Sequence, residues 1–196
     1  MKLYYTPNSP YARICRIALR ESGLSNRITE VEAATRDTNS EFFNVTPLAR
    51  VPALVDGGIL VADTRDICAY FDAVCERVIW CPSETENART YRHIAVGFLD
   101  GVAVWLRENA RPNGEKSTAV MAYEEHRAHI ALAWLEKFQP ATDTLNFSTL
   151  AITCAIDIAR QRGMATDWDA HAPTLLNKVD IALDRPAFRA TTPLAP

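Results

Sequence analysis

The feature that most constrains the fold is a change of sequence pattern near residue 85. Before it, strand-like alternation and helical spacing of apolar residues take turns, whereas after it only helical spacing appears, interrupted by proline and glycine. A chain of 196 residues is long enough for two compact domains. We therefore predict an α/β domain over 1–78, a linker over 79–87 and an all-α helical domain over 88–196.

The first of these domains reads as strand, helix, strand, short helix, two strands and helix. We expect strands over 2–5, 28–32, 51–55 and 58–62 and helices over 10–22, 40–43 and 64–76. Asp56-Gly57, between the last two strands, is typical of a tight hairpin turn. Hairpin strands run antiparallel, whereas a strand–helix–strand unit joins parallel strands, so the sheet is predicted to be mixed.

The second half shows four helical patterns, each ended by proline or glycine. We expect these helices over about 86–109, 117–137, 147–162 and 173–182. No internal repeat or low-complexity segment interrupts them.

Several functional classes conflict with the composition. The longest apolar run, Ile130 to Leu135, has six residues, whereas a membrane-spanning helix needs roughly eighteen. The net charge is only -3 and both signs are evenly spread, so no basic surface for nucleic acid is expected. The N-terminus lacks the apolar core of a signal peptide. We therefore expect a cytoplasmic protein that binds neither membranes nor nucleic acid.

Cysteine and histidine give no pattern of a metal site. Five cysteines, with no C-x-x-C pair, fit reduced thiols better than a disulfide framework. His126 and His129 have a spacing that could share a metal, but the charged neighbours indicate a solvated helix face. We expect no metal and no cofactor.

Three short motifs are candidates for chemistry. Ser9 precedes Pro10 at the start of the first helix, where a serine usually serves as an N-cap. The same position places a hydroxyl beside free backbone N–H groups and the positive end of the helix dipole, which suits an anion. Pro52 stands at the start of a strand, where it cannot donate to the ladder, and a cis Val51–Pro52 bond is plausible. Asp63 opens the next helix, and ordinary capping would also explain it.

Taken together, these motifs resemble the glutathione-binding, thioredoxin-like domain of the cytosolic glutathione S-transferases, in a serine-type, bacterial-like form. The second half also resembles that family, in Phe98-Leu99-Asp100-Gly101, in the helix after Leu145, and in the ending Arg185-Pro186-Ala187-Phe188. One motif departs from the family pattern: Asn146 and Thr149 stand where the capping box usually has Ser or Thr and Asp. We expect weaker capping there and the same fold.

The resemblance implies roles for the candidate residues. Ser9 would stabilise the glutathione thiolate, Val51 would pair its backbone with the cysteinyl part, and Asp63 and Thr64 would bind the γ-glutamyl end. Arg50 matches a basic residue that could meet the glycyl carboxylate, although a solvated surface arginine is nearly as plausible. Asp63-Thr64 replaces the family's more usual Glu-Ser pair, which puts the binding strength in question.

The same resemblance implies a homodimeric detoxification enzyme that conjugates glutathione, its co-substrate, to a small hydrophobic electrophile. Tyr11, Phe98 and Trp105 are candidates for the electrophile pocket, but they fit helix core equally well. Two alternatives stay open. One is a glutathione-dependent disulfide or peroxide reductase, which usually has a cysteine where this chain has Ser9. The other is a non-catalytic binding or regulatory protein.

Overall fold

A computed structural model describes residues 1–140 and 144–195 of the chain. The chain forms two compact units, the first of residues 1–82 and 186–194 and the second of residues 83–185 and 195. The predicted helical domain, 88–196, included the segment 186–194, which the contacts instead group with the first unit.

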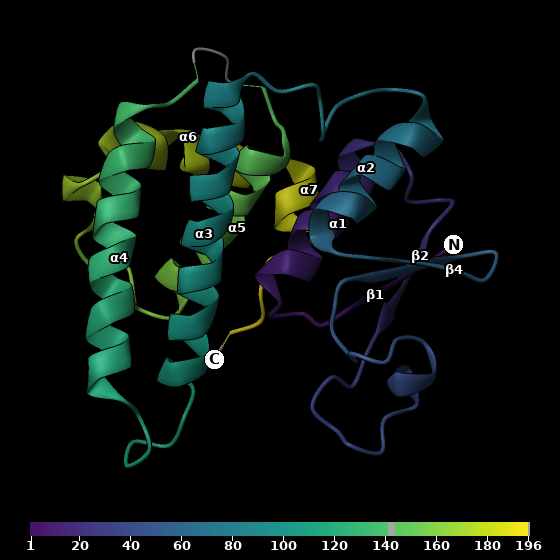
Figure 1. Cartoon of the computed structure of the whole chain (residues 1–196), viewed down its shortest axis with the longest axis horizontal. Coiled ribbons are helices and arrows are strands. Elements are labelled where there is room, and N and C mark those ends of the chain that lie inside the picture. Colours follow the sequence, from purple (N-terminus) through teal and green to yellow (C-terminus); the bar gives the residue numbers. More distant parts are fainter. Residues whose placement is uncertain (141–143, 196) are drawn as a thin grey trace. The chain divides into compact units, whose positions relative to one another are not determined.

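The first unit is built on a four-stranded mixed sheet in the order β2-β1-β3-β4 (Figure 1). The strands are β1 (Lys2–Tyr5), β2 (Thr29–Glu32), β3 (Ala53–Asp56) and β4 (Ile59–Ala62). β1 pairs in parallel with β2, whereas β3 is antiparallel to both β1 and β4. This is the mixed sheet that the strand and helix patterns predicted, in the thioredoxin-like arrangement that the family resemblance implied.

The hairpin turn differs by one residue from the prediction. Asp56 belongs to β3 and pairs with Ile59, so the turn consists of Gly57 and Gly58 rather than Asp56 and Gly57. Both glycines have positive φ, 54° and 90°, as a two-residue hairpin turn of this kind requires.

Helices α1 (Pro10–Glu21) and α2 (Thr64–Cys75) lie together on one side of the sheet, as Figure 1 shows. Leu3 and Leu54 are fully buried neighbours on adjacent strands. The alternate residues Tyr4 and Ala53 join a separate cluster with Phe42 of the short 3-10 helix η1 (Glu41–Asn44). Alternation of side chains across a strand thus gives the sheet a buried layer on each face.

The connection after α2 is fixed by one buried carboxylate. Asp72 accepts hydrogen bonds from the backbone N–H groups of Ile79, Trp80 and Cys81, at 2.9 to 3.1 Å. The indole N–H of Trp80 donates to Ser22 Oγ at 2.8 Å. These bonds hold the chain against α1 and α2 where it leaves the first unit.

The second unit consists of helices, and α3 and α4 lie side by side in Figure 1. Its elements are α3 (Glu86–Asn109), α4 (Thr118–Lys137), α5 (Phe147–Gln161), the 3-10 helix η2 (Trp168–Ala170) and α6 (Pro173–Leu183). Nearly every residue of α5 is buried, so it forms the core of this unit. None of the described helices is both long and apolar enough to cross a membrane.

The unusual capping box of α5 forms in full. Asn146 Oδ1 accepts from the backbone N–H of Thr149 at 3.1 Å, and Thr149 Oγ1 accepts from the backbone N–H of Asn146 at 2.8 Å. A neutral hydroxyl therefore takes the place that a carboxylate has in the usual box.

Candidate functional site

The three sequence motifs of the first unit meet at one end of its sheet. Tyr4, near the end of β1, pairs with Ala53, the first residue of β3, and Ala53 pairs with Ala62, the last residue of β4. The segments that follow β1, precede β3 and follow β4 therefore emerge at the same edge. They carry Ser9, Val51 and Asp63, respectively.

Ser9 is the N-cap of α1. Its backbone is extended, with φ -82° and ψ 114°, and its Oγ accepts a hydrogen bond from Ala12 N at 3.2 Å. Pro10 follows at a position where no N–H is needed. A serine hydroxyl has two acceptor sites and one donor, so capping leaves its O–H available to donate to a ligand. The capping and anion-binding interpretations of Ser9 are therefore compatible.

The Val51–Pro52 peptide bond is cis. Pro52 is buried and Val51 is half-buried, packed against the cluster of Phe42, Ala49 and Ala53. The β3 ladder begins at Ala53, so the backbone of Val51 lies just beyond the paired part of the strand. Arg50, the next residue back, is exposed.

Asp63 holds an unusual backbone conformation. Its φ is 87°, a region that favours glycine, and its Oδ1 accepts from the backbone N–H of Arg65 at 2.9 Å. Such a conformation costs roughly 1–3 kcal/mol in a residue with a side chain, which capping offsets only in part. The chain thus has an exposed carboxylate at a position where glycine would be unstrained.

Thr64, the residue after Asp63, is buried, and so are the nearby thiols of Cys15 and Cys68. Cys15 Sγ donates to the backbone oxygen of Thr64 at 3.6 Å, which joins α1 to the start of α2. Burial, followed by the hydrogen bond with Cys15, raises the pKa of the Cys68 thiol well above its usual value. A fully buried thiol with a raised pKa is a poor nucleophile, so the hydroxyl of Ser9 is the better placed group.

The electrostatics of this edge favour an anion. α1 and α2 are twelve-residue helices, and both begin here, α1 after the short segment that follows β1 and α2 next to the end of β4. Each helix N-terminus carries unsatisfied N–H groups and a partial positive charge of about half an elementary charge. Ser9 and Asp63 add a hydroxyl donor and a carboxylate acceptor. The arrangement can bind a small molecule that carries both anionic and cationic groups.

Sequence reasoning gave no role to Arg13, yet its guanidinium is almost fully buried. Its Nε donates to Thr191 Oγ1 and its Nη2 to the backbone oxygen of Phe188, both at 3.4 Å. Nearby, Asn8 Oδ1 accepts from the backbone N–H of Leu194 at 2.9 Å. The segment 186–194, which includes α7 (Pro186–Arg189), thus supports the start of α1, where Ser9 lies.

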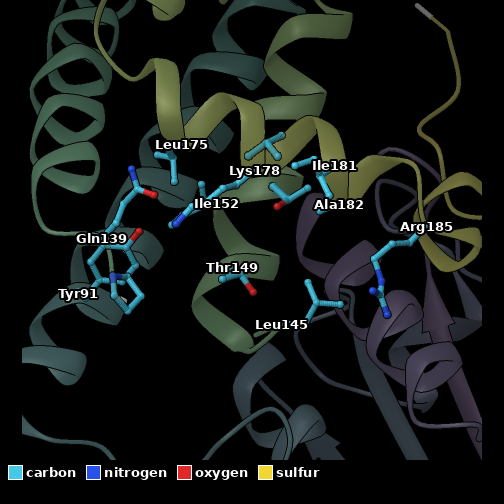
Figure 2. Close-up of a pocket in the computed structure, with 13 residues that line it drawn as sticks. Tyr91, Gln139, Leu145, Thr149, Ile152, Leu175, Lys178, Ile181, Ala182 and Arg185 are labelled. Atoms are coloured by element: carbon cyan, nitrogen blue, oxygen red, sulfur yellow. The ribbon is translucent and has the colours of Figure 1, made fainter. Parts of the chain in front are cut away.

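The second unit contains an apolar pocket of about 200 Å³, shown in Figure 2. In that view, side chains from α3, α5 and α6 surround it, among them Tyr91, Ile152 and Lys178. Burial, with a smaller contribution from the Glu136 carboxylate, raises the pKa of the Tyr91 phenol to about 12. The pocket is large enough for a small apolar molecule. Its lining residues are Tyr91, Gln139, Pro140, Leu145, Thr149, Ile152, Thr153, Leu175, Lys178, Val179, Ile181, Ala182 and Arg185.

The three predicted electrophile-pocket residues do not line this pocket. Tyr11 is half-buried in the first unit, whereas Phe98 and Trp105 are buried on α3 in the second. Phe98 packs against Trp168, with ring centroids 5.5 Å apart, and borders a second pocket of about 230 Å³ between α3 and α4. The indole N–H of Trp105 has no hydrogen-bond partner among the described residues.

The comparisons with known proteins agree with this geometry. A family model described as "Glutathione S-transferase, N-terminal domain" matches residues 8–74, a range that includes Ser9, Val51 and Asp63. The chain carries the N-terminal domain of the glutathione S-transferase family. The uncharacterized GST-like protein YibF of Escherichia coli (strain K12) is 29% identical over 201 residues, with 98% of each chain covered.

Solved structures of this family share the fold over nearly the whole chain. A glutathione transferase family member from Pseudomonas fluorescens Pf-5, with bound glutathione, superposes with a TM-score of 0.83 at 24% identity and 99% coverage of both chains. A glutathione S-transferase from Methylobacillus flagellatus KT, with GSH bound, gives 0.82 at 22% identity, covering 98% of this chain and 99% of that one. At 22% and 24% identity, the similarity to these two structures shows that the fold is shared.

Proposed function

We propose that this protein binds glutathione at the edge of the first unit and conjugates its thiolate to a small hydrophobic electrophile. The observation that carries the proposal is the meeting of Ser9, Val51 and Asp63 at one sheet edge, beside two helix N-termini. Similar structures with bound glutathione support it.

In this proposal, the Ser9 hydroxyl donates a hydrogen bond to the glutathione sulfur. A free thiol with a pKa of about 8.5 is only a few per cent ionised at pH 7. Lowering its pKa to about 7, where half of the thiol is ionised, takes about 2 kcal/mol. One hydrogen bond to a charged group supplies roughly 1.5–3 kcal/mol, and the dipole of α1 adds to it. A general base is therefore unnecessary.

The other residues hold the peptide. The backbone of Val51 would pair with the cysteinyl part of glutathione. Asp63 and the buried Thr64 would bind the γ-glutamyl end, where the carboxylate can accept from the α-amino group. Arg50 would meet the glycyl carboxylate. A homodimer in the cytoplasm with a detoxification role belongs to the same proposal, and a monomeric mass at micromolar concentration would contradict the dimer.

The test compares Ser9→Ala with the wild-type protein. We expect the variant to bind glutathione, to raise the pKa of the bound thiol and to conjugate a generic aryl halide about tenfold to a hundredfold more slowly. The thiolate absorbance in the ultraviolet measures that pKa directly. Ser40→Ala is the matched control, because Ser40 also caps a helical turn of the first unit, with Oγ accepting from Phe42 N at 3.2 Å.

Two results would reject parts of the proposal. If calorimetry finds no glutathione binding to the wild-type protein, the transferase function fails. If Ser9→Ala leaves the thiol pKa and the conjugation rate unchanged, the role of Ser9 fails while glutathione binding stands. Asp63→Asn tests the γ-glutamyl contact, since it keeps the cap but removes the charge, and we expect weaker glutathione binding by about tenfold or more.

A further inference from the structure

Three potential metal ligands from separate segments meet in the second unit. His129 lies on α4, whereas Asp167 and His171 flank the short helix η2. His129 Nε2 lies 3.0 Å from Asp167 Oδ1, and His171 Nε2 lies 4.0 Å from Asp167 Oδ2. One donor atom from each residue lies within 4.8 Å of the other two.

Buried packing fixes the backbone that carries these side chains. Trp168, inside η2, is almost fully buried and packs against Phe98 of α3. The turn places Asp167 and His171, four residues apart, on the same side, and the backbone N–H of His171 donates to Trp168 O at 3.0 Å. On α4, His129 follows a buried alanine. The cluster is therefore positioned by the core.

A simple ion pair does not explain the whole cluster. The bond between His129 and Asp167 would suffice to fasten α4 to the η2 segment. The structure adds a second imidazole, that of His171, stacked on the first with ring centroids 4.5 Å apart and planes inclined by 21°. The stacking brings a nitrogen of each imidazole and an oxygen of Asp167 to within 4.8 Å of one another, which an ion pair between two residues does not require.

We propose that His129, Asp167 and His171 bind a divalent transition-metal ion of the zinc class. Two imidazole nitrogens and one carboxylate oxygen are ligands that zinc takes at about 2.0–2.2 Å, which places tetrahedral ligands about 3.4 Å apart. His129 Nε2 lies 3.0 Å from one oxygen of Asp167 and His171 Nε2 lies 4.0 Å from the other oxygen, and one donor atom of each residue lies within 4.8 Å of the other two, so small movements reach that spacing. Rotation of the Asp167 and His171 side chains, 57% and 37% exposed, closes the site.

The bound ion would tie α4 to the η2 segment and leave its fourth position to water. The site is independent of the proposed glutathione chemistry, because none of its residues belongs to the first unit. It also revises the sequence prediction of no metal. That prediction weighed His129 only with His126, its neighbour in sequence, and the partners of His129 lie about 40 residues further along the chain.

The test is a titration with Co²⁺, which reports its ligands by colour, followed by competition between Zn²⁺ and a chromophoric chelator at pH 7.5. We expect one ion per chain, visible d–d bands and no thiolate charge-transfer band, because the site has no cysteine. His129→Ala, His171→Ala and Asp167→Asn should each weaken Zn²⁺ binding by more than about tenfold. His93→Ala and His126→Ala, the other two histidines of the chain, are controls that should bind as the wild-type protein does.

Thermal unfolding gives a second measurement. Saturating Zn²⁺ should raise the melting temperature of the wild-type protein and of His126→Ala, but not that of His171→Ala. His129→Gln replaces His129→Ala if the alanine variant does not fold, because an amide can still bond to Asp167. The proposal is overturned by a thiolate band, by wild-type Zn²⁺ binding in the variant that combines His129→Ala, Asp167→Asn and His171→Ala, or by an equal loss of Zn²⁺ binding in His126→Ala.

Discussion

Replacement of Asp72 should destabilise the first unit more than any other single change to an acidic residue there. Its carboxylate accepts from three consecutive backbone N–H groups, those of Ile79, Trp80 and Cys81, and its side chain is 7% exposed. The connection between α2 and α3 therefore depends on one side chain.

The magnitude follows from the burial of the three donors. Trp80 is 1% exposed, whereas Ile79 and Cys81 are half-buried, so water can reach the last two more easily. An unsatisfied buried group costs roughly 1–3 kcal/mol. Asp72→Ala should therefore lower the free energy of unfolding by about 3 kcal/mol. Asp72→Asn keeps one acceptor oxygen and should cost about half as much.

Urea unfolding followed by tryptophan fluorescence measures both values, since Trp80 lies at the site. Asp66→Asn is the control: Asp66 is exposed in the first turn of the same helix, and its loss should cost no more than about 1 kcal/mol. The reasoning is refuted if Asp72→Asn unfolds within about 0.5 kcal/mol of the wild-type protein, or if Asp66→Asn is the more damaging of the two.

Two further predictions concern the second unit. Gly97→Ala should stabilise α3 in urea unfolding by up to about 1 kcal/mol, because nothing lies within 4 Å of the added Cβ. Gly101→Ala should gain less, because its Cβ would lie 2.9 Å from Oε2 of the buried Glu124 and that side chain would have to shift; equal effects would contradict this. The pKa of the Tyr91 phenol is about 12, above its usual value of about 10, so folding stability should be fully present below pH 10 and fall as the pH rises toward 12. Tyr91→Phe should flatten that fall in pH-dependent unfolding, and the exposed Tyr123→Phe should leave it unchanged.

The sequence predicted the long elements well, because their ends carry local signals. Helix α3 runs from Glu86 to Asn109, as expected, and the first residues of α1, α2, α5 and α6 also match. Prolines, caps and glycines act within a few residues, so a sequence shows them. The helices η2 and α7 were missed because they are only three and four residues long, and their burial at Trp168 and Phe188 depends on distant packing.

The residues of the candidate site could likewise be predicted only where their signals are local in the sequence. That Ser9, Val51 and Asp63 meet could be anticipated, because each lies next to the end of a predicted strand. The hairpin register could not, since Asp56-Gly57 and Gly57-Gly58 are both common hairpin turns. The partners of Arg13, some 175 residues away, and those of His129 leave no local signal at all.

The contacts of Arg13 have a consequence for how the protein is made. During synthesis, the four strands, α1 and α2 are complete about a hundred residues before Phe188 and Thr191 exist. Until then, the Arg13 guanidinium lacks these two hydrogen-bond partners. Its free energy is then lower in water than in the interior, where it lies in the finished protein. Chain emergence runs from the N-terminus, so the first unit, although begun first, would reach its final packing only after the helical unit has been translated.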